Sequence, residues 1–171
     1  PDERSTYKLL YGEAFRAPNS SELLYNVGSV AVVPDLKPEQ LSNVEAVVER
    51  ILDGGWRVSG SLFHYEAEDL LARVVDPVTS ELLYRNVGSV QGNGLELELE
   101  RRFASGKRLR VSQAFQEVED KDTGDHLVNS PRFVTQVVAE TPAFTPNLLA
   151  GIELVYVGER DTLAGDTADG Y

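Results

Sequence analysis

The chain has 171 residues, of which 28 are acidic and 16 basic, so its formal net charge is −12. This length is sufficient for one ordinary domain. The negative charge argues against a nucleic-acid partner, because such proteins need basic side chains to neutralise phosphates. The absence of cysteine excludes disulfide scaffolds and thiolate-bound zinc. No apolar run approaches the roughly 20 residues of a transmembrane helix, whereas membrane β-strands need only about 9–11 residues and are not excluded.

Apolar and polar residues alternate along most of the chain, as is typical of strands with two different faces. In the clearest case Leu95, Leu97 and Leu99 alternate with three glutamates. The strand around residues 107–119 is less regular, because Gln113 falls among apolar residues of the same face, as does Glu117 nearer the strand's end. We predict strands at about residues 5–14, 39–51, 56–68, 90–103, 107–119, 131–141 and 147–157.

The predicted connections alternate between short and long. Short turns fall at Asp53–Gly55, Ser105–Lys107 and Thr141–Pro146, where Gly and Pro are frequent. Long connections cover about 15–38, 69–89, 120–130 and the tail from 158. Short turns at one end and long loops at the other are typical of an outer-membrane barrel, whereas a Greek-key sandwich mixes them. Strand lengths of about 10–14 residues also favour a barrel over a soluble sandwich, in which the leucines would form the core.

A near-repeat lies in two of the long connections. The segment 21–30 recurs at 80–90 with Arg85 inserted. Two copies do not make a solenoid, which needs at least three stacked units. We interpret the similarity as coincidental and both copies as short loop hairpins.

Several blocks of residues occur in an order characteristic of one family and cover almost the whole chain. These blocks are Tyr11–Pro18, Glu22–Tyr25, Pro34–Glu39, Phe63–Tyr65, Asp69–Leu71, Asn86–Gly88, Gly94–Glu98 and Asn129–Arg132. With these blocks the chain resembles TonB-dependent outer-membrane receptors, the gated transporters of Gram-negative bacteria.

The resemblance implies an all-β fold of long antiparallel up-and-down strands, a sector of a barrel of about 22 strands whose lumen holds a plug. Residues 1–171 would be a partial barrel domain from the C-terminal part, without the plug and the final strands. The intact protein would reside in the outer membrane and import a scarce nutrient, most readily a ferric siderophore, with energy from TonB. Its partners would be that nutrient, its own plug domain, TonB and outer-membrane lipid.

Two groups of residues are candidates for this function. Aromatic and cationic side chains in the long loops are candidates for ligand binding: Arg16, Tyr25, Tyr84 and Arg85. Carboxylates on the polar strand faces are candidates for a structural role facing the lumen: Glu45, Glu49, Glu96 and Glu98. We expect such carboxylates to pair with arginines between 101 and 110, although Arg101 and Arg102 are adjacent and cannot both face inward.

We expect no catalytic residue, no metal site and no cofactor. His64 falls in a predicted strand and His126 in a loop, and no Gly-x-Ser-x-Gly elbow is present. The segment Asp120–Asp125 has oxygen ligands but fails the EF-hand spacing, which indicates a solvated acidic turn. A passive porin-like barrel and a soluble all-β carbohydrate-binding module remain open as alternative functions.

Overall fold

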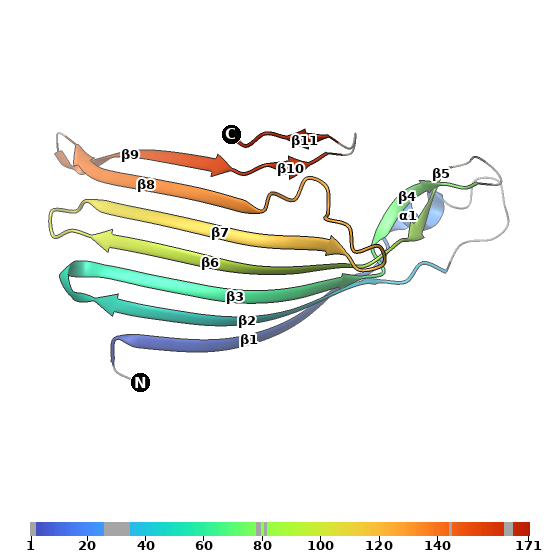
Figure 1. Ribbon diagram of the computed structural model, residues 1–171, viewed down its shortest axis with the longest axis horizontal. Coiled ribbons are helices and arrows are strands. Elements are labelled where there is room, and N and C mark those ends of the chain that lie inside the picture. Colours follow the sequence, from blue (N-terminus) through green and yellow to red (C-terminus); the bar gives the residue numbers. More distant parts are fainter. Residues whose placement is uncertain (1–2, 26–34, 78–79, 81, 144, 163–165) are drawn as a thin grey trace.

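Seven long strands form one antiparallel sheet (Figure 1) in the spatial order β1-β2-β3-β6-β7-β8-β9. The computed structural model describes residues 3–25, 35–77, 80, 82–143, 145–162 and 166–171. The long strands are β1 (Ser5–Arg16), β2 (Glu39–Leu52), β3 (Trp56–Glu68), β6 (Val90–Arg102), β7 (Arg108–Asp120), β8 (Phe133–Ala143) and β9 (Thr145–Val157). The seven predicted strands and the all-β fold are therefore confirmed, with ends that differ by one or two residues.

Short and long connections lie at opposite ends of the sheet, as predicted. The turns β2–β3, β6–β7 and β8–β9 share one end, at the left of Figure 1. The other end carries helix α1 (Ser20–Tyr25) and the hairpin of β4 (Leu71–Val75) and β5 (Leu82–Asn86). Two short strands, β10 (Arg160–Asp161) and β11 (Thr167–Ala168), pair beside the end of β9. We call the two ends of the sheet the short-turn end and the loop end.

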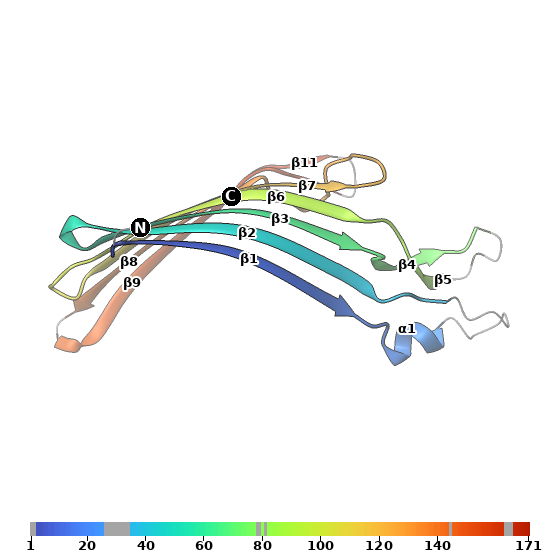
Figure 2. The ribbon, with the colours of Figure 1, turned by 90° about the horizontal axis from the view of Figure 1, so that it is seen from below.

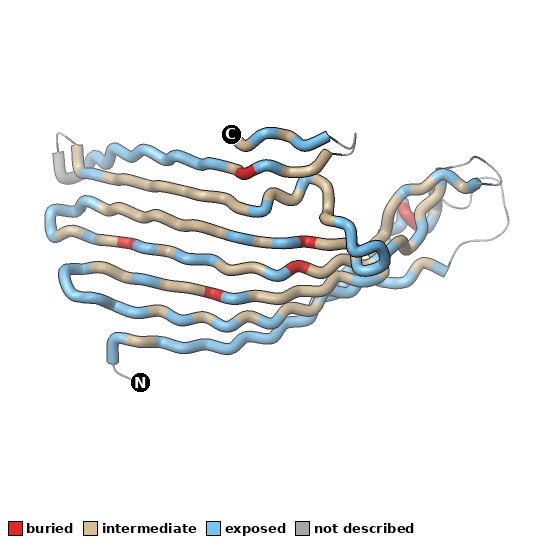
Figure 3. The backbone as a smooth tube through the Cα atoms, viewed as in Figure 1, coloured by how far each residue is buried: buried red, intermediate tan, exposed pale blue. Residues whose placement is uncertain are grey.

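The described strands form a single layer without a hydrophobic core. Figure 2 shows one curved sheet, and Figure 3 shows buried residues scattered along it. Among the described apolar residues only Val118 is buried, whereas Leu9 is 78%, Leu62 61% and Ile152 60% exposed. The alternative in which the leucines form the core of a soluble sandwich is therefore wrong for this chain, because no second sheet formed by the described residues covers them.

Strand register sorts the side chains onto two different faces. Leu99 of β6 lies in one cross-strand row with Val58, Val111, Val137 and Leu154. We call this side, which also carries Leu95 and Leu97, the apolar face. We call the opposite side, which carries Glu96, Glu98 and Glu100, the carboxylate face. Successive side chains of a strand point to opposite sides, so the sequence alternation becomes two chemically distinct surfaces.

Gln113, the irregular residue in β7, lies on the apolar face but has hydrogen-bond partners within the sheet. It is in register with Thr135 of β8, whose hydroxyl donates to the Gln113 side-chain oxygen. The Gln113 amide nitrogen donates to the main-chain oxygens of Ala114 (3.0 Å) and Val134 (3.1 Å). The side-chain oxygen and nitrogen of Gln113 both have hydrogen-bond partners within the sheet, so β7 and β8 stay in register at this polar residue.

Two glycines of β6 make room for aromatic rings on the carboxylate face. Gly94 is paired with Phe63 and Gly92 with Tyr65 of β3. A Cβ atom at Gly94 would lie 2.2 Å from the ring of Phe63, and one at Gly92 would lie 2.4 Å from that of Tyr65. The two rings stack on each other with centroids 6.3 Å apart. Glycine is therefore required at both positions because each ring lies directly against the main chain.

The two copies of the near-repeat fold differently: the second lies in a hairpin, as we interpreted it, and the first begins with a helix, which corrects our interpretation of that copy. The second copy contributes β5, which pairs with β4. In the first copy, the described part forms α1 and residues 26–30 lie outside the described residues. Asn19 precedes α1 and its side chain accepts hydrogen bonds from the main chain of Ser21 (2.9 Å) and Glu22 (3.0 Å). The second copy has Val78 at the position of Asn19 and lacks this helix cap.

Candidate functional site

The structure brings the two long connections that contain the predicted ligand residues together at the loop end. Helix α1, which ends at Tyr25, contacts strand β5, which carries Tyr84 and Arg85 (Figure 1). The side chain of Tyr25 lies outside the described residues. Arg85 is exposed and forms an ion pair of 2.7 Å with Asp76. Residues from segments some sixty positions apart in sequence therefore form one surface.

Arg16, the fourth predicted ligand residue, lies at the base of these loops. Its guanidinium pairs with Glu22 of α1 (3.0 Å) and with Glu39, its register partner at the start of β2. The second oxygen of Glu39 accepts a hydrogen bond of 2.8 Å from the main-chain nitrogen of Leu71 in β4. Arg16 and Glu39 thus tie both connections to the ends of the strands. Charge-assisted bonds of this kind are stronger than neutral ones.

Glu22 is buried, with 8% of its surface exposed, and it serves both the helix and Arg16. One carboxylate oxygen accepts a 2.8 Å hydrogen bond from the main-chain nitrogen of Asn19, which completes a capping box. This hydrogen bond, followed by those from Arg16, holds the pKa of Glu22 below its ordinary value. The carboxylate is therefore charged at neutral pH and fixes the start of α1.

Asn86 joins the bases of the two connections, a role that the sequence analysis did not assign. Its side-chain oxygen accepts from the main-chain nitrogen of Lys37 (2.8 Å), and its amide donates to the Lys37 carbonyl (2.9 Å) and to the carbonyl of Asp69. Lys37 also lies 3.6 Å from the Asp69 carboxylate. The hydrogen bonds between Asn86 and Lys37 join residues that are 49 positions apart in sequence. The only signal for Asn86 in the sequence was therefore its position in a motif block.

The four predicted glutamates of the carboxylate face line one groove of about 580 Å³. These residues are Glu45, Glu49, Glu96 and Glu98. Glu49 pairs with Lys8 at 3.0 Å, and Glu98 pairs with Arg57 at 3.0 Å. Within the described ranges no ion pair involves Glu45 or Glu96. The groove therefore contains two neutralised and two unpaired carboxylates.

Glu100 pairs with three arginines, and it was not among the residues predicted from the sequence. It is 3% exposed and contacts Arg108 (2.6 Å), Arg102 (2.9 Å) and Arg57 (3.8 Å). Arg101 points to the opposite face, as expected for neighbours in a strand. The signal in the sequence was a glutamate with arginines on both sides of a tight turn, which hairpin register brings within reach.

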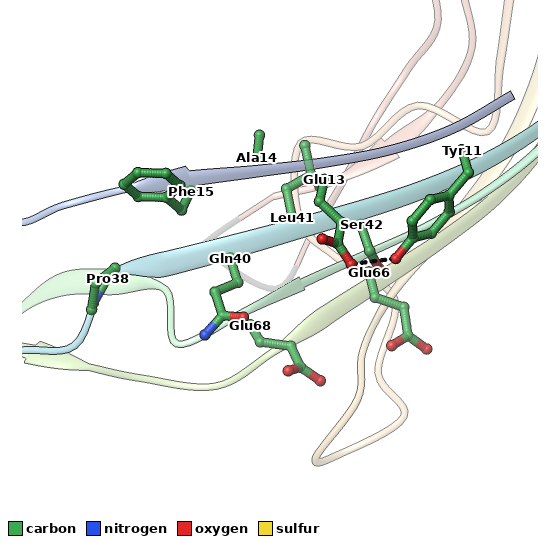
Figure 4. Close-up of a pocket in the computed structure, with 10 residues that line it drawn as sticks. All are labelled: Tyr11, Glu13, Ala14, Phe15, Pro38, Gln40, Leu41, Ser42, Glu66 and Glu68. Carbon is green, nitrogen blue, oxygen red and sulfur yellow. Dashed lines mark hydrogen bonds between the residues drawn. The ribbon is translucent and has the colours of Figure 1, made fainter.

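A second hollow, of about 690 Å³, lies across β1, β2 and β3 near the loop end (Figure 4). The Tyr11 hydroxyl hydrogen bonds to Glu13 at its edge. Lys121 neutralises two further carboxylates, of Glu66 (3.0 Å) and Glu68 (3.2 Å). Hydrogen bonds to Glu66 and then Glu68 raise the pKa of Lys121 above its ordinary value. This hollow contains none of the predicted ligand residues.

The histidines lie in separate local environments. His64 contacts Asn93 through its Nδ1 atom at 2.8 Å, and His126 contacts the carbonyl of Ser130 through its Nε2 atom at 3.0 Å. In the turn after β7, the Asp120 carboxylate accepts hydrogen bonds from the main chain of its own turn. Among the residues that the structure describes, no three His, Cys, Asp or Glu side chains gather in a group suited to a metal ion. None of the described helices is long and apolar enough to cross a membrane.

The sheet is a sector of a large up-and-down β-barrel. Three features indicate this: the apolar face is uncovered, the opposite face is ion-paired, and all long loops lie at one end. The family model described as "TonB dependent receptor-like, beta-barrel" matches residues 3–171. The chain therefore belongs to the TonB-dependent receptor family, which confirms the resemblance found in its sequence. This family is a class of transport receptors and not of enzymes.

Solved transporter structures share this fold. The FrpB iron transporter from Neisseria meningitidis has 19% sequence identity and a TM-score of 0.72, and the match covers 100% of this chain and 29% of that one. The ferric enterobactin receptor PfeA from Pseudomonas aeruginosa, in a mutant form, has 20% identity and a TM-score of 0.76, over 99% and 29%. The copper transporter OprC has 16% identity and a TM-score of 0.71, over 100% and 28%. A comparison with curated proteins finds no match.

Proposed function

We propose that this chain forms part of the barrel of an outer-membrane transporter that imports a scarce nutrient with energy from TonB. The observation that carries the proposal is the single-layer sheet, whose apolar face has no protein cover and whose opposite face is a network of ion pairs. A barrel placed in lipid satisfies both faces, because lipid covers the outside and a wet lumen contacts the inside. The chain spans less than a third of the solved transporters that it matches, so the remaining strands, the plug and the TonB contact would lie elsewhere in the protein.

In this proposal the nutrient binds at the loop end. Tyr84 and Arg85 would contact the ligand, and Tyr25 stays a candidate on its sequence position, while Arg16 holds the loop bases and forms the inner margin of the site. Arg85 is paired with Asp76, and an anionic ligand would compete with that carboxylate for the guanidinium. Charge-assisted bonds from arginine to an anionic chelate would then fix the orientation of the ligand.

The nutrient that fits these side chains best is a ferric siderophore. Tyrosines provide flat apolar contact with a polar end, and arginines complement the negative charge of iron chelates. Of the structurally similar proteins, one is described as an iron transporter, one as a ferric enterobactin receptor and one as a copper transporter. These names support a metal-containing nutrient, and the siderophore is our choice within that class.

On the carboxylate face, the unpaired Glu45 and Glu96 would face the lumen and accept basic side chains of the plug. Glu49 and Glu98 are neutralised within the sheet and would keep the wall rigid. This division assigns plug contact to the carboxylates that the sheet itself leaves unpaired. Replacing Glu45 and Glu96 together with glutamine should loosen the plug and increase antibiotic leakage, whereas replacing Glu49 should have a smaller effect.

The test uses the full-length protein encoded by the gene that contains this chain. Its gel mobility should change on boiling in detergent, and cells should take up radioactive iron as a siderophore complex only when TonB is present. Replacing Tyr84 with alanine and Arg85 with glutamine should reduce uptake without changing the heat-modifiable band. Uptake that persists without TonB would indicate a passive pore, and a soluble protein of unchanged mobility would refute the membrane placement.

A further inference from the structure

Arg101 is the one arginine of the 101–110 group that points to the apolar face, and two aromatic rings hold it there. Its guanidinium carbon lies 5.0 Å from the ring centroid of Trp56 and 4.4 Å from that of Phe103. Its Nε atom is buried and, within the described residues, has no hydrogen-bond partner. No ion pair between Arg101 and a described carboxylate is present. The side chain is therefore held as a cation that no described carboxylate neutralises.

A groove of about 500 Å³ begins beside the same aromatic ring. Phe103 and Lys107, on either side of the β6–β7 turn, line it together with Ala139 and Ile152. Its one carboxylate, of Glu140, lies 3.6 Å from the guanidinium of Arg108, which also lines the groove. Lys107 is exposed and forms no ion pair with a described residue. Two cations without carboxylate partners thus lie at the short-turn end, next to a mostly apolar groove.

Strand register places these parts on one surface. Trp56, Arg101, Leu109, Ala139 and Ile152 occupy successive positions of one cross-strand row, from β3 through β9. Because this row lies on the apolar face, Arg101 and the groove floor face the same medium. Because Ala139 is small, a depression lies over it between larger side chains, and a hydrocarbon chain fits there.

We propose that this surface, formed by Trp56, Arg101, Phe103, Lys107, Ala139 and Ile152, binds an anionic phospholipid of the leaflet next to the short turns. The lipid phosphate would contact Arg101 and Lys107, and an acyl chain would lie in the groove over Ala139 and Ile152. Charge complementarity selects this occupant, because the cations lack carboxylate partners and the floor is apolar. This inference rests on the membrane placement under the proposed function, and it adds a specific lipid contact to the general apolar band.

The aromatic rings explain why a specific contact is expected here rather than simple attraction to the membrane surface. Tryptophan and phenylalanine near a barrel rim lie at the level of lipid headgroups. They hold the guanidinium of Arg101 in one place, so little side-chain freedom is lost when a phosphate binds. An isolated surface cation elsewhere on the chain has the same charge but no such support.

The test is a titration of the purified full-length receptor with phosphatidylglycerol, followed by native mass spectrometry, with phosphatidylcholine of the same acyl chains as reference. Arg101→Gln and Lys107→Gln should each weaken phosphatidylglycerol binding about fivefold, the change expected for one cation near an anionic lipid. Arg73→Gln is the matched control, because Arg73 is exposed on β4 at the loop end and has no described ion-pair partner. It should leave lipid binding unchanged. Ala139→Leu fills the groove without a change of charge and should also weaken binding.

Heat-modifiable gel mobility checks that each variant is folded, and Lys107→Gln alters only an exposed turn if Arg101→Gln fails this check. Equal phosphatidylglycerol affinity in the wild type and folded Lys107→Gln would overturn the inference while leaving the transporter proposal intact. Displacement of the lipid by inorganic phosphate would also overturn it, because a simple anion site does not need the groove. A protein that does not enter outer membranes would refute the transporter proposal itself.

Discussion

The hydrogen bond between Thr135 and Gln113 provides a direct test of whether the apolar face contacts lipid. Thr135→Val keeps the shape of the side chain and removes the hydroxyl that donates to the Gln113 oxygen. In water the freed oxygen would find a solvent partner at little cost. In hydrocarbon no such partner is available, so the loss should appear as reduced stability.

The magnitude follows from the bonds that the structure shows. Hydrogen bonds between side chains in membrane proteins contribute about 0.6 kcal/mol on average and at most about 1.7 kcal/mol. Thr135→Val should therefore reduce the free energy of unfolding by about 1 kcal/mol. Gln113→Leu removes the polar group altogether, together with its bonds to the carbonyls of Ala114 and Val134. Those carbonyls belong to strands that are already paired, but the variant also leaves the Thr135 hydroxyl without its acceptor, so it too should lose about 1 kcal/mol.

The double variant completes a thermodynamic cycle. Once Gln113 is leucine, Thr135→Val removes a hydroxyl that has lost its acceptor and should not reduce stability further, so the coupling free energy should be at least as large as the cost of the single Thr135 variant. The assay is reversible folding of the full-length barrel into lipid vesicles, followed by urea titration. Additive effects of the two substitutions, with no coupling, would refute the reasoning. A parallel titration in short-chain detergent micelles, which admit more water, should give a smaller coupling.

Three further predictions concern the apolar face, the β6 glycines and the loop base. Leu97→Arg should destabilise the barrel in vesicles by about 2–4 kcal/mol, because it places a charge in lipid. Leu82→Arg, on the loop hairpin, should cost far less. Equal costs of the two variants in a urea titration would contradict the two-faced arrangement. Gly94→Ala should cost about 1–3 kcal/mol, because its Cβ would lie 2.2 Å from the ring of Phe63, and adding Phe63→Leu should recover part of that cost in the same titration. Folding lowers the pKa of Glu22, so its stabilising contacts are complete above its unfolded-state pKa and are lost as the pH falls through the folded-state pKa. Proteolysis of the loop should therefore accelerate at acidic pH in the wild type. A Glu22→Gln variant should show a weaker pH dependence.

The sequence specified local features that depend on neighbouring residues. Alternation at Leu95–Glu100 determined which residues share a face, because side chains of a strand point to opposite sides with a period of two. Glycine and proline clusters located the turns, and the unequal lengths of the connections placed all long loops at one end. The sequence therefore predicted the strands and the grouping of Glu45, Glu49, Glu96 and Glu98.

The near-repeat shows where local similarity misleads. Its two copies share most of their letters, yet a single capping residue, Asn19, accompanies a helix in one, while the other pairs with β4. Hydrophobic pattern alone does not distinguish these outcomes in such short segments. Hydrogen bonds at the first turn and an available partner strand decide between them.

Only the tertiary structure determined which distant residues meet. The contacts of Asn86 with Lys37, of Glu39 with Leu71, and the row that joins Arg101 to the groove floor all depend on strand order and register. These quantities are set by pairing across the whole sheet and have no signature at any single position. Alternation fixes what each strand presents to its two sides, whereas register fixes which charges, rings and loops lie together, and the function depends on both.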